Sequence, residues 1–205
     1  MAQASASATP PQVGRLQRRK ARTRAAILEG AGGLFQQQGY EDTSIQQIAE
    51  SADTGVGTLY GYFASKEAIL HEVLRLNSDQ ATQRYRAAVD ESTPAIERIS
   101  TALATFADYI ADNRTVLMAA FQVGVRRGLA TEQPLEWLLT AYKGLLAEGI
   151  SAGTLAEVPV DATARMLLGT YLMAMLGIGI WSGREDDPQT RADLEALARQ
   201  LVSRR

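Results

Sequence analysis

Cysteine is absent from the 205-residue chain, and histidine occurs only once, as His71. Without cysteine the chain can form no disulfide, no thiolate zinc site and no cysteine nucleophile. The single histidine limits metal chemistry further, and there is no P-loop, no GxGxxG motif after a strand and no HExxH motif. An enzyme is therefore a poorly supported class of function, and we expect no cofactor and no metal site.

Long, uninterrupted apolar runs are also scarce. Residues 1–14 are mostly Ala, Ser, Thr, Pro and Gln and lack the apolar segment of a secretory signal peptide. The most apolar stretch, 162–181, is long enough to be weighed as a membrane span, but Thr163, Arg165 and Thr170 interrupt it. We expect a cytoplasmic protein in which this helix is buried between subunits rather than in lipid.

Charge is distributed unevenly although the net charge is only −2. Up to Lys66 there are seven basic and five acidic residues, and the basic excess is concentrated between Arg15 and Arg24. This asymmetry indicates that the N-terminal part binds a polyanion. We expect residues 1–20 to form a disordered basic tail. The basic run 15–24 is either solvated or an arm that follows phosphates or enters a minor groove.

Helical periodicity begins after this run. Apolar residues at Ile27, Ala31, Leu34 and Phe35 predict a helix with one buried stripe that ends at Gly39. A second helix opens with a capping box, in which Thr43 or Ser44 precedes a Gln by three residues, and ends near Ser51. About three residues then separate it from a short apolar run, 56–63. This length and connection are typical of a helix-turn-helix.

Only helical patterns follow, so the sequence predicts an all-α protein of about nine helices. Ser65 caps a long fourth helix, and Asp187 with Pro188 opens the last one. The remaining predicted helices are 95–112, 114–128, 132–151, 161–181 and 188–203. We expect a compact helix-turn-helix domain of three helices at 21–66 and a larger helical domain at 67–205.

The stretch from Ile48 to Glu67 resembles the signature of the TetR family of repressors. Its most diagnostic parts are Gly57-Thr58-Leu59-Tyr60, the pair Tyr62-Phe63, and Ser65-Lys66-Glu67. The resemblance implies a homodimer with two recognition helices in successive major grooves of a palindromic operator. It also implies a dimer interface made by helices 161–181 and 188–203, an effector pocket in the C-terminal domain, and a phosphate contact by Lys66.

The expected recognition helix contains no Arg, Lys, Asn or Gln between Gly55 and Tyr62, so direct base contacts should be few. We expect Thr54 to cap it, Val56 and the Thr58 methyl to favour thymine methyls, and Gln46 or Gln47 to supply amide contacts. Phosphates should be bound mainly by the remaining polar residues, Tyr60, Tyr62, Ser44 and Thr43. The predicted DNA-binding residues are Thr43, Ser44, Gln46, Gln47, Thr54, Gly55, Val56, Gly57, Thr58, Tyr60, Tyr62 and Lys66.

Large adaptable side chains in the C-terminal domain have two interpretations. Each one is a candidate for ordinary core packing, and together they can line a pocket for a hydrophobic or aromatic ligand. The predicted ligand-binding residues are Phe106, Tyr109, Met118, Phe121, Trp137, Tyr142 and Met173. His71 lies on the fourth helix, which would join the pocket to the DNA-binding domain.

The sequence thus predicts a ligand-responsive transcriptional repressor, which binds double-stranded DNA as a homodimer and is released by a small hydrophobic or aromatic effector. A regulator of the same fold that senses no small molecule remains an alternative. An enzyme is the third and least supported hypothesis.

Overall fold

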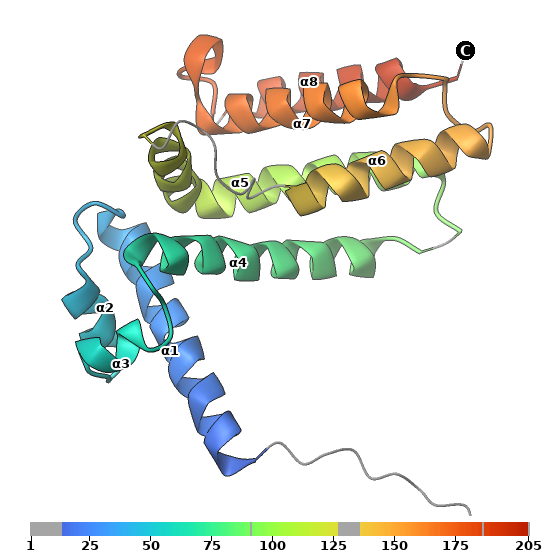
Figure 1. The fold of residues 1–205 in the computed structure, drawn as a ribbon. Helices are drawn as coiled ribbons and strands as arrows, with labels where there is room; N and C mark the ends of the chain where they lie inside the picture. Colours follow the sequence, from blue (N-terminus) through green and yellow to red (C-terminus); the bar gives the residue numbers. More distant parts are fainter. Residues whose placement is uncertain (1–13, 91, 127–135, 186, 205) are drawn as a thin grey trace, which may run out of the picture.

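The regular structure of the described residues is helical, apart from one isolated bridge between Leu155 and Ser203. The computed structural model describes residues 14–90, 92–126, 136–185 and 187–204, without the side chain of Trp137. Figure 1 shows α1–α3 beside a bundle formed by α4–α8. The elements are α1 (Arg15–Gln38), α2 (Ile45–Ser51), α3 (Val56–Tyr60), α4 (Lys66–Ala88), α5 (Ala95–Arg126), α6 (Glu136–Ser151), α7 (Val160–Leu176), the 3-10 helix η1 (Gly179–Trp181) and α8 (Pro188–Val202). The all-α prediction is confirmed.

The first helix begins earlier than its apolar stripe suggests. The predicted disorder of residues 1–20 is wrong for residues 15–20, which form the first turns of α1, while residues 1–13 lie outside the described part. Arg, Leu, Gln and Lys are good helix formers, and they extend a helix already nucleated by its packed half. That half buries Ile27, Leu28, Ala31 and Phe35, and the helix ends at Gly39 as predicted.

The second helix is capped in one of the two registers that the sequence allows. The Ser44 hydroxyl accepts a hydrogen bond from Gln47 N at 3.1 Å, and the Gln47 side chain accepts one from Ser44 N at 2.8 Å. This reciprocal capping box satisfies two backbone donors at the start of α2. Ser44, rather than Thr43, therefore caps α2.

The third helix is shorter than expected and is capped by another residue. Thr54 does not cap it: the Thr54 amide bonds Ala49 O at 2.9 Å and closes the turn after α2. Gly55 is the extended N-cap and Gly61 follows the last helical residue. Helix α3 stops at Tyr60 because the next two amides, of Gly61 and Tyr62, bond carbonyls only three residues back, Thr58 O at 3.0 Å and Leu59 O at 2.9 Å.

Two predicted helices are joined in α5, which bends at Asn113. This residue has non-helical dihedrals (φ −120°, ψ 15°) and lies in the gap between the predicted segments 95–112 and 114–128. Its side chain donates to Tyr109 O at 2.8 Å and accepts a hydrogen bond from Asn77 of α4. The bend thus has polar support from both helices, and the described residues contain eight α-helices rather than about nine.

The apolar seventh helix ends at Leu176, not at Trp181. Gly177 adopts a left-handed conformation (φ 67°, ψ 39°) that terminates α7. A Cβ there would lie 2.5 Å from Glu185 Oε2, so a side chain would also displace the Glu185 carboxylate. None of the helices in the described ranges is both long and apolar enough to cross a membrane.

The last helix starts as predicted. Asp187 accepts hydrogen bonds from Gln189 N at 3.1 Å and from the Thr190 hydroxyl at 2.7 Å, and Pro188 occupies the first helical position. Helix α8 packs on α5 and α7, while α4, α5, α6 and α7 surround the core of the bundle.

Candidate DNA-binding surface and ligand cavity

The outer face of α2 and α3 is exposed and carries most of the predicted DNA contacts. Leu59 and Phe63 point inward as predicted, at 0% and 6% exposure. Val56 and Tyr60, by contrast, are 38% and 53% exposed on a helix of only five residues. Exposed apolar surface of this kind is available to a partner. The other exposed predicted contacts are Ser44, Gln46, Gln47, Gly55, Gly57 and Thr58.

Three predicted contacts are withdrawn from this face. Thr43 is only 1% exposed, and its hydroxyl donates to Gly39 O at 2.6 Å, so it stabilises the turn after α1 instead of facing a phosphate. Thr54 and Tyr62 are half-buried, and Tyr62 packs against the core. Residue type alone did not distinguish these inward positions from outward ones.

Lys66 holds the corner that leads into α2. Its ammonium donates to Tyr40 O at 2.7 Å and to Thr43 O at 2.8 Å, with a longer contact to Glu41 O at 3.4 Å. It also lies 4.2 Å from the centroid of the Tyr40 ring, a cation–π distance. The ammonium is thus already surrounded by acceptors. A phosphate contact by Lys66 stays a prediction and requires it to give up one of these carbonyls.

The two glutamines of α2 differ in how free their amides are. Gln46 donates to Glu50 Oε1 at 3.1 Å, one turn along the same exposed face. Gln47 uses its oxygen in the capping box, so a base contact from this residue would come from its amide nitrogen. Gln46 therefore keeps its Oε1 acceptor and one N–H donor for a DNA contact, whereas Gln47 has mainly its N–H donors available.

Arg24 joins α1 to α4, a role that the sequence does not reveal. It pairs with Glu72 at 2.5 Å and lies 5.2 Å from the centroid of the Phe63 ring. Glu72 also accepts two hydrogen bonds from Arg75, at 2.9 and 2.8 Å. The hydrogen bonds from Arg75 and then Arg24 outweigh burial and lower the pKa of Glu72 to about 2. Arg24 is therefore a structural cation.

A cavity of about 220 Å³ lies between α4, α5 and α6. Three of the seven predicted ligand residues line it, namely Phe106, Tyr109 and Tyr142. Met118, Phe121 and Met173 are half-buried but do not line it, and the side chain of Trp137 is outside the described part. The lining residues not predicted are Ala81, Thr82, Tyr85, Arg86, Ala102, Thr105, Leu138, Ala141 and Leu145.

The three tyrosine hydroxyls at this cavity are in different states. Tyr109 donates to Leu74 O at 3.4 Å and Tyr142 to Ile99 O at 3.2 Å, and burial raises the pKa of both. The Tyr85 hydroxyl is buried and forms no well-aligned hydrogen bond with the described residues; the Arg98 guanidinium lies near enough to donate to its oxygen, which leaves the hydroxyl hydrogen without an acceptor there. Since a buried unsatisfied hydroxyl is costly, Tyr85 is the polar group that a ligand can satisfy.

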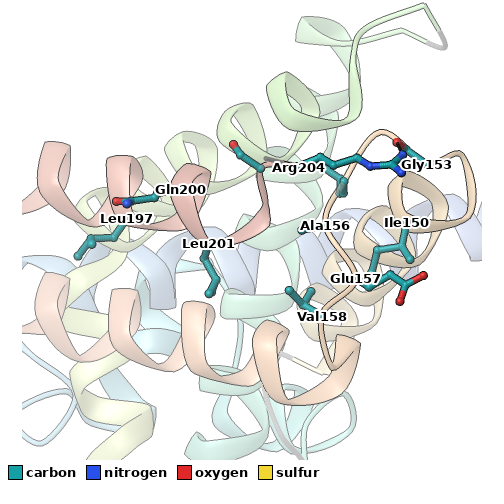
Figure 2. Close-up of a pocket in the computed structure, with 11 residues that line it drawn as sticks. Ile150, Gly153, Ala156, Glu157, Val158, Leu197, Gln200, Leu201 and Arg204 are labelled. Atoms are coloured by element: carbon teal, nitrogen blue, oxygen red, sulfur yellow. Dashed lines mark hydrogen bonds between the residues drawn. The ribbon is translucent and has the colours of Figure 1, made fainter.

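The predicted dimerisation helices present exposed apolar side chains. The stripe of α8 is divided: Leu194, Ala198 and Val202 are buried against the same chain, while Leu197 and Leu201 are 60% and 39% exposed. Figure 2 shows these two leucines on α8 beside a groove whose other wall includes Ile150 and Val158. On α7, Met166 is 53% exposed.

Comparison with known proteins agrees with this architecture. A model of the family described as bacterial regulatory proteins, tetR family, matches residues 27–73. The fatty acid metabolism regulator protein of Bacillus subtilis is 26% identical over 150 residues, which are 70% of this chain and 77% of that protein. The HTH-type transcriptional repressor KstR2 of Mycobacterium tuberculosis is 38% identical over 76 residues, which are 37% of this chain and 38% of the repressor.

The fold is shared with a solved structure, that of the fatty acid degradation regulator FadR from Bacillus halodurans. The TM-score is 0.69 at 19% sequence identity, and the alignment covers 94% of this chain and 97% of that chain. The helix-turn-helix built on α2 and α3, the matched family model and the shared fold lead to one conclusion: residues 27–73 form a DNA-binding domain of the kind found in the tetR family of bacterial regulatory proteins, and the chain as a whole is similar to transcriptional regulators of that family.

Proposed function

We propose that this regulator represses transcription by binding a palindromic operator as a homodimer, and that a small hydrophobic or aromatic ligand in the α4–α5–α6 cavity releases it. The observation that carries the proposal is the course of α4. This helix is capped by Ser65, directly after the helix-turn-helix, and its far half supplies Ala81, Thr82, Tyr85 and Arg86 to the cavity. One rigid element therefore connects the two sites.

Dimerisation is supported by the exposed side chains of α7 and α8. Leu197, Leu201 and Met166 expose apolar surface that a twofold mate would cover in a four-helix interface. Two α3 helices in such a dimer would enter successive major grooves if their separation were about 34–36 Å. The exposed Val56 and Thr58 would then contact base edges, chiefly thymine methyls.

The cavity supports a ligand of limited size. A cavity of about 150 Å³ is known to hold benzene, so about 220 Å³ suits a single ring with a short substituent or a short acyl chain. The lining is mostly apolar, and the unsatisfied Tyr85 hydroxyl would donate to an acceptor oxygen on the ligand. Because the Bacillus subtilis relative is named for fatty acid metabolism, short fatty acids belong in a ligand panel beside single-ring aromatic acids.

Release would follow from a shift of α4. Tyr109 lines the cavity and bonds Leu74 O of α4, and one turn further Asn113 bonds Asn77 of α4. A ligand that displaces Tyr109 would favour a conformation in which α4 is moved and the two α3 helices no longer match the grooves. The mechanism requires that ligand-bound and DNA-bound dimers differ in the separation of their α3 helices.

The test is to titrate the purified protein onto genomic fragments, including the DNA upstream of its own gene, at two salt concentrations, and to footprint the bound site. A protected palindrome bound by a dimer is the expected result. Weak, sequence-independent binding that vanishes with salt would contradict operator recognition. The ligand panel is then added to the operator complex. If no compound weakens binding, the regulator that senses no small molecule becomes the better hypothesis.

A further inference from the structure

The N-terminal half of α1 carries a cationic stripe that has no role in the contacts described so far. Between residues 15 and 28 the sequence has six basic residues and no acidic one. Arg15, Arg18, Arg19 and Arg22 are spaced at i, i+3, i+4 and i+7, so in the helical conformation they share one face. All four are exposed, and none forms an ion pair with a residue that the structure describes.

Arg24, the last of the six basic residues, lies where α1 begins to extend beyond the packed part of the DNA-binding domain. Arg24 is held by Glu72 and the Phe63 ring, so α1 is anchored beside the end of α3 at this residue. The nine residues before it extend about 13 Å further at the rise of an α-helix. Figure 1 shows this end of α1 projecting past α2 and α3, on the side away from α4–α8.

We infer that this stripe, Arg15, Arg18, Arg19 and Arg22, is a second DNA contact, which binds the phosphates that flank the operator bases contacted by α3. The inference rests on the proposed operator binding. The occupant is indicated by charge complementarity, since duplex DNA is the polyanion that the adjacent helix-turn-helix binds. Because the stripe is exposed beside α3, the stripe and α3 can bind the same duplex.

The helical conformation decides between the two ways in which a basic arm can contact DNA. An α-helix with its side chains is about 10–12 Å across, whereas the minor groove of B-DNA is about 6 Å wide. A helical stripe therefore cannot enter the groove as an extended arm does, and its guanidinium groups reach the phosphate backbone instead. Such contacts add affinity and salt dependence without adding sequence preference.

The experiment compares the double variant R18Q/R22Q with R84Q/R184Q. The control removes the same two charges from exposed sites on α4 and before α8, far in sequence from the stripe. Glutamine is a good helix former, so circular dichroism should be unchanged. Operator and random-duplex affinities are measured from 50 to 200 mM salt. The slope of log K against log[salt] should fall by about 0.9 for each phosphate that R18Q/R22Q no longer neutralises, and the slope of the control should stay at the wild-type value.

The operator and the random duplex should lose affinity by the same factor, so that the specificity ratio is unchanged. Equal slopes for wild type, R18Q/R22Q and the control would overturn the inference while leaving operator binding intact. Failure of the wild type to bind any operator would instead overturn the proposed function. A loss confined to operators with A·T-rich flanks would indicate minor-groove insertion and also contradict the phosphate stripe.

A second variant tests the helical geometry with every charge retained. Ala21 is exposed within the stripe, and A21P removes a helical hydrogen bond and breaks α1 before Thr23. The inference predicts weaker DNA binding by A21P at every salt concentration, because the four guanidinium groups no longer share a face. Wild-type affinity in A21P would show that a flexible arm serves equally well, and would overturn the helical stripe.

Discussion

The DNA-binding unit and the cavity region satisfy their polar groups to different degrees. Around α1–α3 the Thr43 hydroxyl, the Lys66 ammonium and the Ser44 side chain all bond backbone groups, and Phe35 is completely buried. Between α4, α5 and α6 there is unfilled space and a buried Tyr85 hydroxyl without a hydrogen-bond partner in the described part. The proposed DNA-binding surface is thus internally satisfied, whereas the proposed ligand site retains space and an unused donor.

The largest expected effect is on the filled core of the DNA-binding unit. The Phe35 ring is 0% exposed and its centroid lies 5.4 Å from that of Tyr40, so F35A should lower the free energy of unfolding by about 3–5 kcal/mol. Urea denaturation followed by circular dichroism measures this loss. L16A, at a side chain that is 67% exposed, is the control and should change stability by less than about 0.5 kcal/mol.

Filling variants compare the packing of the two regions directly. Ala31 is 0% exposed in the α1 core, and A31L should cost about 1–3 kcal/mol through overpacking. A102L adds the same atoms beside the cavity and should cost clearly less, because the space already exists.

The same pair of variants also separates the functions. A102L should bind DNA like the wild type but lose its response to the ligand, as seen by titrating the operator complex. An equal loss of stability in A31L and A102L would mean that the cavity is not available space.

Removing one buried hydroxyl from each region should change stability less than these packing variants do, but it should separate the two regions clearly in ligand affinity. T43V removes a buried hydroxyl that donates to Gly39 O and should cost roughly 0.5–1.5 kcal/mol. Y85F removes a hydroxyl with no partner among the described residues, so stability should be unchanged or slightly higher. Ligand affinity should fall in Y85F but not in T43V. Calorimetry with a ligand from the panel measures this, and unaltered binding by Y85F would exclude the hydroxyl as the ligand's donor.

The last expected effect is on the pH dependence of the free energy of unfolding, at the Glu72 junction of α1 with α4. The pKa of Glu72 is about 2 in the folded chain against an ordinary value of 4.5, so the unfolded chain binds a proton first. Its stabilisation is complete above about pH 5 and disappears as the pH falls towards 2. E72Q should therefore flatten the dependence of unfolding free energy on pH between 5 and 2. An identical acid profile for wild type and E72Q would refute this role.

Local signals explain which features could be predicted. Ser44, Ser65 and Asp187 cap helices at or next to the expected positions because capping depends on a few consecutive residues. Even the bend at Asn113 fell between two predicted helices. The helix-turn-helix was identified for the same reason, since its spacing and inward residues are contained in one short segment.

Long-range contacts explain the errors. Gly177 ends α7 through its left-handed backbone, which an apolar pattern that continues to Trp181 does not reveal. The carbonyls that hold Lys66 lie more than 20 residues away, so its inward contacts were not predicted, although its phosphate contact stays a prediction. Tyr85 and Arg86 line the cavity because α4, α5 and α6 come together there. Helical periodicity identifies a face but not the element opposite, and it contains no information about space left unfilled.

The inward turn of Thr43 and the engagement of Lys66 have a consequence for engineering. Part of the recognisable motif serves as scaffold, so a match to it describes how the helix-turn-helix is assembled and carries little information about which DNA is read. If the proposed operator binding is correct, the choice of operator falls to a small set of exposed residues, Gln46, Val56, Thr58 and Tyr60. Libraries restricted to these four positions should then re-target the protein to new DNA sequences, and the proposed ligand response should remain that of the parent.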